Sequence, residues 1–429
     1  MNEAKQASGA SRRELLKYAG LGGIALAAGA HGLAGPAFGA GEIRGATVAS
    51  MKDPLGEAIA AFEAENPGTS IRMEFGDTDP IVTTTRVQLT SGTAPDLITV
   101  WPGGGNALAV RQLVPNDFLV DLSDRPWAAS VPEGFDAVMK VDGKQWFLSM
   151  QLSMIGGIVN MRTWETLGVG QPTTWSEFVA VCQEIKDKGV IPIAIGNGTG
   201  FVPQLISFAL VASNVFGPEP DFAEQMLDGK ATFSGSAGWH SALEKYVQLN
   251  DLGFFNENVN GTSNQEQIDM VASGKAAMMI MVSNQIPGVR KAAGHDDFWQ
   301  LPIPGTDNPD ETKISASPSS GFGVNAASSN QADALAFLDS MASPEGVTRW
   351  ANSSGLATVL PGSTGTFDFI YKDMYPLLRG GRSVPHQDNK WPNTRVQQTH
   401  TAGIQELLNG TTTIDAVLAS MDEAFVSQG

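Results

Sequence analysis

Apolar residues along this chain follow two alternating patterns, and one stretch in the first half shows both. The uninterrupted apolar run Ile155–Val159 predicts a buried strand. From Trp175 to Ile185, apolar residues recur every three or four positions, which predicts an amphipathic helix. Thr174 stands three residues before Glu177, the spacing of an N-terminal capping box. The run VIPIAI at 190–195 predicts the next strand, so this stretch is typical of an α/β protein.

Strands and helices also alternate directly after the first forty residues. Ile43–Ala49, Ser70–Phe75 and Asp96–Trp101 have the composition of buried strands. Leu55–Glu65 and Ile81–Ser91 between them have helical spacing. A β-α-β-α-β order predicts a largely parallel sheet with ligand chemistry at the strand ends.

The region 152–299 is rich in predicted helices, and strand patterns return after it. No internal repeat or long low-complexity tract interrupts the chain. The clearest further elements are helices at 236–252, 265–273 and 332–342 and strands at 276–282 and 322–325.

Composition narrows the class of protein. Of the 429 residues, 42% are hydrophobic and 17% charged, as in globular domains. The formal charge of −18 repels phosphate backbones and argues against a nucleic-acid partner. The single cysteine, Cys182, excludes an intramolecular disulfide, and its place on the apolar face of a predicted helix favours a small buried hydrophobe.

Residues 1–40 are expected to be a targeting segment. Ser11–Lys17 closely matches the twin-arginine export pattern, and the Gly/Ala-rich run Tyr18–Ala30 is too short for an ordinary transmembrane helix. We expect cleavage after Gly39. No cysteine lies near that position, so we expect a free periplasmic protein that is neither a lipoprotein nor inserted in a membrane. The alternative is a basic amphipathic start on a cytoplasmic protein.

Several short motifs in a fixed order carry a family resemblance. They are AFEAENP at 61–67, SGTAPD at 91–96, VDGKQW at 141–146, TTWSEF at 173–178, GKAAM at 274–278, LPIPG at 301–305 and the helix at 334–344. Each motif alone is weak, but their order resembles the extracellular solute-binding proteins of family 1. These are the sugar-type, maltose-binding-protein-like receptors of ABC importers.

The resemblance implies a type II-like periplasmic-binding-protein fold, with two α/β lobes that close on a solute about a hinge. It implies a first lobe of 41–151 with 300–342, and a second lobe of 152–299 with 343–429. It also implies a monomer that binds without catalysis, needs no cofactor or metal, and delivers a mono- or disaccharide or a polyol to the permease subunits of an importer.

Sugar recognition requires aromatic rings for the C–H face and polar side chains for the hydroxyl rim. We therefore take aromatic and polar residues at the expected interlobe loops as candidates. The candidate ligand-binding residues are Ser50, Asp53, Asp77, Asp79, Trp101, Gln151, Asn197, Asn284, Ser320, Asp388 and Trp391.

Some of these residues have a second interpretation. Trp101 is either a stacking ring or a core aromatic, and Trp391 is either a rim aromatic or a packing residue. Asp77 and Asp79 are either ligand contacts or a turn-forming pair before Pro80. The glycines at 103–105 are expected to let a hydroxyl approach the backbone.

The sequence departs from the family after the strand at 276–282. Relatives often have a glycine and a tryptophan there, whereas this chain has VSNQ at 282–285. A carboxamide in place of a stacking ring favours a smaller or more polar solute.

Two other functions remain open from the sequence. A secreted carbohydrate-active enzyme needs only two carboxylates, although no G-x-S-x-G or H-E-x-x-H motif is present. The same fold could instead bind a phosphorylated solute such as a glycerophosphodiester, or a cation complex. The phosphorylated solute would require basic groups in the cleft, for which Lys52, Arg86 and Arg111 are the nearby candidates.

Overall fold

The computed structural model describes residues 41–361 and 369–427, and the expected export segment lies outside them. A first sheet has the strand order β11-β3-β1-β2. β1 pairs in parallel with β2 and β3, as the β-α-β-α-β pattern predicts, and β11 joins antiparallel to β3. The strands are β1 (Glu42–Val48), β2 (Ser70–Gly76), β3 (Leu97–Val100) and β11 (Gly321–Val324).

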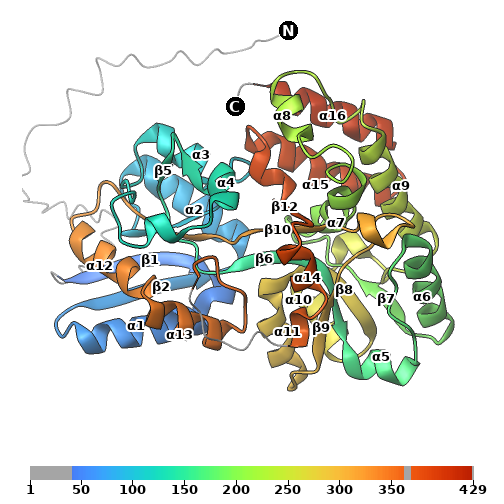
Figure 1. The fold of residues 1–429 in the computed structure, drawn as a ribbon, viewed down its shortest axis with the longest axis horizontal. Helices are drawn as coiled ribbons and strands as arrows, with labels where there is room; N and C mark the ends of the chain where they lie inside the picture. Colours follow the sequence, from blue (N-terminus) through green and yellow to red (C-terminus); the bar gives the residue numbers. More distant parts are fainter. Residues whose placement is uncertain (1–40, 362–368, 428–429) are drawn as a thin grey trace, which may run out of the picture. The chain divides into compact units, whose positions relative to one another are not determined.

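Helices pack on this first sheet and enclose a hydrophobic core with it (Figure 1). We call these elements the first lobe. A short hairpin, β4 (Lys140–Val141) with β5 (Lys144–Gln145), lies in the same part of the chain. The helices are α1 (Lys52–Glu65), α2 (Thr78–Ser91), α3 (Val110–Leu113), α4 (Asp136–Met139), α12 (Gln331–Met341) and α13 (Pro344–Ser354).

A second sheet is mixed and has the order β12-β10-β6-β8-β7, with β9 also paired to β6. Every residue of the long strand β6 is buried, as its uninterrupted apolar run predicts. The strands are β6 (Leu152–Asn160), β7 (Ile191–Ala194), β8 (Ala276–Val282), β9 (Phe298–Leu301), β10 (Ile314–Pro318) and β12 (Ser383–Val384).

The helices around the second sheet form a second hydrophobic core, and we call these elements the second lobe. The predicted helix from Trp175 is confirmed, and its capping box is complete because Thr174 accepts from the Glu177 backbone while the Glu177 side chain accepts in return. The helices are α5 (Met161–Leu167), α6 (Trp175–Asp187), α7 (Gln204–Asn214), α8 (Phe222–Leu227), α9 (Ala237–Asp251), α10 (Asn264–Ala272), α11 (Ile286–Ala293), α14 (Met374–Arg379), α15 (Thr394–Leu408) and α16 (Ile414–Val426).

The two cores divide the C-terminal half differently from the expected lobe boundaries. β9 and β10 pair with β6 and belong to the second lobe, although 300–342 was expected in the first. α13 packs on α1 and places Trp350 in the first core, although 343–429 was expected in the second. The reason is strand pairing and the apolar face of α13, neither of which follows from chain order.

The chain passes between the lobes close to Ser319 and Ser320, since β10 pairs in the second sheet and β11 in the first. A second passage precedes β6, where Leu148 bridges to Phe322 in the first lobe and Leu152 pairs with β10. Among the described residues, no helix is long and apolar enough to cross a membrane.

Candidate ligand-binding cleft

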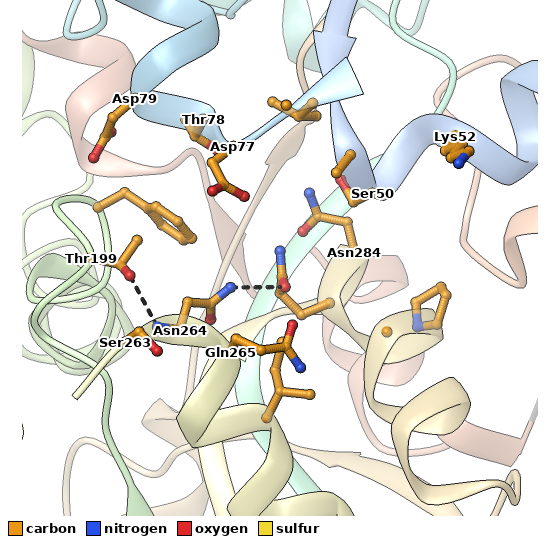
Figure 2. Close-up of a pocket in the computed structure, with 18 of the residues that line it drawn as sticks. Ser50, Lys52, Asp77, Thr78, Asp79, Thr199, Ser263, Asn264, Gln265 and Asn284 are labelled. Atoms are coloured by element: carbon orange, nitrogen blue, oxygen red, sulfur yellow. Dashed lines mark hydrogen bonds between the residues drawn. The ribbon is translucent and has the colours of Figure 1, made fainter. Parts of the chain in front are cut away.

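A cavity of about 800 Å³, which we call the outer compartment, is lined by residues of both lobes. The first lobe contributes the loops after β1 and β2, with Ser50 and Asp77. The second lobe contributes Thr199 from the loop after β7, Asn264 from the start of α10, and Asn284 from the segment after β8. Figure 2 shows these side chains around one space. The cavity therefore lies at the ends of strands, where ligands bind in open α/β sheets.

Helix N-termini explain why the wall of the outer compartment is polar. α1, α2, α10 and α11 all begin beside it, and the first turn of a helix leaves backbone N–H groups without intrahelical partners. The Thr199 hydroxyl accepts the Asn264 N–H at 2.9 Å, and the Asn264 amide donates to Gln285 Oε1 at 3.3 Å (Figure 2). These bonds connect three separate loops into one wall.

The outer compartment contains both signs of charge. Asp53, Asp77 and Asp79 are carboxylates, and Lys52 and Lys291 are cations. Asp53 and Asp79 stand in the first turns of α1 and α2, and Asp77 precedes α2. The positive end of a helix dipole stabilises carboxylates at such positions, so these three have an electrostatic partner without any ligand.

A smaller cavity of about 130 Å³, the inner compartment, adjoins the outer one. The two compartments share wall residues, among them Ser50, Phe201, Asn284 and Gln285. The other walls of the inner compartment come from Trp101 at the end of β3, the start of α7, the crossing at 318–320 and the segment 386–389. The two compartments together form one cleft lined by both lobes.

Aromatic rings are concentrated in the inner compartment. Trp101 is half-buried and lines it, as do Phe201 and Phe208. Phe208 makes an edge contact with Trp391, at 5.6 Å between ring centroids. Phe208 is nearly fully buried and stacks on His400, so Trp101 and Phe201 supply the accessible apolar surface beside the carboxamides. Apolar rings beside carboxamides are what recognition of a pyranose ring requires.

Two titratable side chains, His386 and Asp388, also line the inner compartment. The His386 ring nitrogens lie 2.8 Å from Ser315 Oγ and 3.1 Å from Ser153 Oγ. Burial lowers the pKa of His386 to about 3, so its ring is neutral at physiological pH. Burial raises the pKa of Asp388 to about 7, against a smaller opposite effect of backbone hydrogen bonds.

Eight of the candidate residues line the cleft. Ser50 and Asn284 border both compartments, and Asp53, Asp77 and Asp79 line the outer one. The remaining three residues line the inner compartment. Those three are Trp101, Ser320 and Asp388.

Gln151, Asn197 and Trp391 line neither compartment. Gln151 is 1% exposed, and its Oε1 accepts the Trp350 indole N–H at 3.1 Å, inside the first lobe. Asn197 is fully buried behind its loop, and its carbonyl accepts Gln405 Nε2 at 2.6 Å. Trp391 is 3% exposed and belongs to the second core, so the packing interpretation describes it.

The glycines at 103–105 have a different role from the one expected. A Cβ on Gly103 would lie 2.0 Å from the Asn389 carbonyl oxygen, and one on Gly105 would lie 2.4 Å from that of Asp388. The glycine loop therefore lets the 388–391 segment of the second lobe pack directly against the first lobe. Its backbone approaches protein rather than solute.

Sequence reasoning missed several lining residues. Phe201, Gln204 and Gln397 have no local pattern that marks them, because their position depends on how α7 and α15 pack. Asn264 and its neighbour Gln265 carry one usable signal. They follow Ser263, which with Glu266 forms a capping box, and so mark a helix N-terminus.

Comparison with known families identifies the class of protein. A family model described as bacterial extracellular solute-binding protein matches residues 57–370. The chain belongs to this family. The solute-binding protein fold accounts for the two lobes and for a cleft lined by both.

Individual relatives of this solute-binding protein are distant. The multiple sugar-binding protein of Streptococcus mutans is 24% identical over 262 residues, which cover 59% of this chain and 60% of that protein. The osmoprotective compounds-binding protein GgtB of Synechocystis is 27% identical over 171 residues, 37% of this chain and 38% of that protein. The matched stretches thus span about 60% or less of these relatives.

A solved structure of RafE in complex with raffinose is similar to this solute-binding protein in fold. Its TM-score is 0.74 with 18% sequence identity, and the match covers 90% of this chain and 98% of that one. A chitin oligosaccharide binding protein gives a TM-score of 0.72 with 19% identity over 86% of this chain and 93% of that one. At these identities the likeness establishes the shared fold.

Proposed function

We propose that this protein is the periplasmic substrate-binding component of an ABC importer for a small carbohydrate or polyol. The observation that carries the proposal is the inner compartment, where Trp101 and Phe201 provide apolar faces beside the carboxamides of Asn284 and Gln285. That combination matches a sugar ring with its C–H face and hydroxyl rim. The sugar-binding and osmoprotectant-binding names of distant relatives support the same class of solute.

The solute would bind by closure of the lobes and leave chemically unchanged. A mono- or disaccharide suits the combination of a narrow inner compartment with a wider outer one. Affinity would come from the stacked rings and from hydrogen bonds that are desolvated on closure, each net contribution being about 1 kcal/mol.

A phosphorylated solute is a weaker candidate because of the charges in the cleft. Lys52 and Lys291 are outnumbered there by carboxylates. Arg111 lines neither compartment and donates to the Ala137 carbonyl at 2.6 Å. Arg86 also lies outside them, with its guanidinium 5.6 Å from the Phe118 ring centroid.

A thermal-shift screen over sugars, polyols, phosphate esters and amino acids tests this function. We expect carbohydrates or polyols to raise the unfolding midpoint in proportion to occupancy. Chromatography of each stabilising solute after prolonged incubation separates binding from turnover. A midpoint raised only by phosphate esters would contradict the sugar assignment, and cleavage of the solute would establish the enzyme alternative.

Export and oligomeric state follow as parts of the same proposal. The twin-arginine leader would deliver a free, monomeric receptor to the periplasm. Replacement of Arg12 and Arg13 by lysine should retain the full-length chain in the cytoplasm of a producing bacterium, as measured by cell fractionation. Sedimentation of the exported protein tests the monomer.

A further inference from the structure

The inner compartment contains a carboxylate with no cationic partner among residues 41–361 and 369–427. Asp388 accepts hydrogen bonds from Gln397 Nε2 at 3.2 Å and from Asn389 Nδ2 at 3.3 Å, and both donors are neutral carboxamides. The nearest lysine in sequence, Lys390, is paired with Glu224 at 2.7 Å instead. None of the described residues therefore compensates the negative charge of an ionised Asp388 within the cavity.

The other groups around Asp388 in the part of the chain that the structure describes do not supply a positive charge. His386 is neutral and has both ring nitrogens beside serine hydroxyls. Arg111 comes close to the glycine loop that packs on Asp388, but its guanidinium donates to a backbone carbonyl of the first lobe. From α7 and the segment after β8, the facing groups are the uncharged side chains of Gln204, Asn284 and Gln285.

Asp388 also differs from the carboxylates of the outer compartment in its backbone environment. Asp53 and Asp79 lie in the first turns of fourteen-residue helices, whose dipoles stabilise a negative charge. Asp388 lies in a four-residue 3₁₀ segment, Gln387–Lys390, which offers no comparable dipole. A carboxylate at this depth is unfavourable unless it is protonated or paired, and part of its surface remains open to the cavity.

We propose that the solute carries a positive charge, as an amino sugar or amino polyol, and that its ammonium group pairs with Asp388. The ring or carbon chain would lie against Trp101 and Phe201, whose faces also attract a cation. Hydroxyls would meet the carboxamides of Gln204, Asn284 and Gln285. This inference rests on the carbohydrate function proposed above and specifies the chemical class of the solute.

Proton linkage gives the inference a distinctive signature. The raised pKa of Asp388, about 7, leaves much of the free protein protonated there at pH 6. A cation binds to the ionised carboxylate and lowers its pKa, so binding at pH 6 must release a proton. Affinity for the cationic solute therefore decreases as pH falls through 7, while affinity for a neutral sugar changes less.

The experiment compares glucosamine, galactosamine and mannosamine with their neutral parent sugars and N-acetyl derivatives. Isothermal titration is performed at pH 6 and at pH 7.5 in buffers of different ionisation enthalpy. We expect at least one amino sugar to bind about tenfold or more tightly than its parent sugar, with proton release at pH 6. Asp388→Asn should remove that preference and the proton release, and Asp228→Asn, which removes a surface carboxylate of the Lys230 ion pair, should change neither.

The unliganded protein provides a check that does not depend on the solute. Because the folded pKa of Asp388 lies above its ordinary value of 3.8, the folded state binds more protons than the unfolded state between about pH 4 and pH 7. Its contribution to stability is thus lost as pH rises through that window. The Asp388→Asn variant should fold. The difference between its thermal unfolding midpoint and that of the wild type should increase in favour of the variant from pH 5 to pH 8.

Each result decides the inference. If no amino sugar binds more tightly than its parent, or if Asp388→Asn keeps the preference, the charge assignment is wrong while the carbohydrate function stands. If neither amino sugars nor neutral carbohydrates bind, both the proposed carbohydrate function and the charge assignment are wrong.

Discussion

The outer and inner compartments of the cleft are built by different means. The outer one is lined by loops that directly follow strands and by the first turns of helices, such as Asp77 before α2 and Asn264 in α10. The inner one is assembled from segments as far apart in sequence as Trp101, Phe208, Ser320 and Asp388. Local chain geometry therefore accounts for the walls of the outer compartment, whereas tertiary packing brings together the distant segments of the inner one.

The difference has an energetic consequence. When a solute binds, polar groups at helix N-termini in the wide outer compartment exchange water contacts for solute contacts, so each contributes little net free energy. Rings and carboxamides in the narrow inner compartment are desolvated when the lobes enclose a solute, so each contact there contributes more. We expect affinity to be concentrated in the inner compartment and chain-length tolerance in the outer one.

Trp101→Ala is the strongest test of that division. Loss of the stacking face should weaken binding of the best carbohydrate by roughly 3 kcal/mol, about two orders of magnitude in Kd. Titration calorimetry measures the change. Gln265→Ala in the outer compartment is the matched variant and should cost less than about 1 kcal/mol. Equal losses in the two variants would contradict the division.

Gly105→Ala tests the contact between lobes beside the inner compartment. The new methyl group would lie 2.4 Å from the Asp388 carbonyl oxygen, so we expect a loss of about 2 kcal/mol in unfolding free energy from overpacking. Gly56→Ala in α1 is the control, because its Cβ would meet nothing within 4 Å, and it should be neutral or slightly stabilising. Urea denaturation compares the two. An unperturbed Gly105→Ala variant would favour the solute-approach interpretation of this loop.

Asn284→Ala tests the boundary that the compartments share. This side chain borders both, so its loss should weaken every carbohydrate ligand by about 1.5 kcal/mol, regardless of length. Ser320→Ala, confined to the inner compartment, should have an effect that is nearly equal for a monosaccharide and a disaccharide but smaller in size. A loss confined to disaccharides in Asn284→Ala would place it in the outer compartment alone.

Thr174→Ala tests scaffold against site. Its side chain accepts the Glu177 N–H in the capping box, so its loss should lower the unfolding free energy by about 1 kcal/mol. Affinity should not change, because this helix lines neither compartment. Thr174→Ser retains the cap and should restore stability. Reduced affinity in a folded Thr174→Ala protein would show that this helix influences the cleft.

Much of the fold could be predicted from local patterns. The run at 155–159 lies in the C-terminal part of β6, and the helix predicted from Trp175 begins at that residue, directly after its capping residue Thr174. The first three predicted strands pair in parallel as β1, β2 and β3. These features depend on periodicity and on side chains a few positions apart, which the sequence contains directly.

The lining of the candidate cleft was most predictable where it directly follows a strand of the first sheet. Asp77 and Trp101 were predicted because each follows a strand of the first sheet, and both line the candidate cleft. Gln151 and Trp391 were taken as ligand contacts, yet one bonds Trp350 and the other packs in the second core. Phe201 was missed because no local pattern marks its loop, which lines the cleft only when the two lobes are folded together.

The sequence by itself determined the class of the strongly periodic elements, such as β6 and α6, and the family to which the chain belongs. The tertiary structure decided that α13 packs on the first lobe and that the glycines at 103–105 fit against Asp388 and Asn389. It also decided that Asp388 lies inside the cleft with no cationic partner among residues 41–361 and 369–427. The physical reason is the distance along the chain over which each interaction acts. Backbone preference and hydrophobic periodicity act over a few residues, whereas burial and charge compensation depend on neighbours hundreds of residues away.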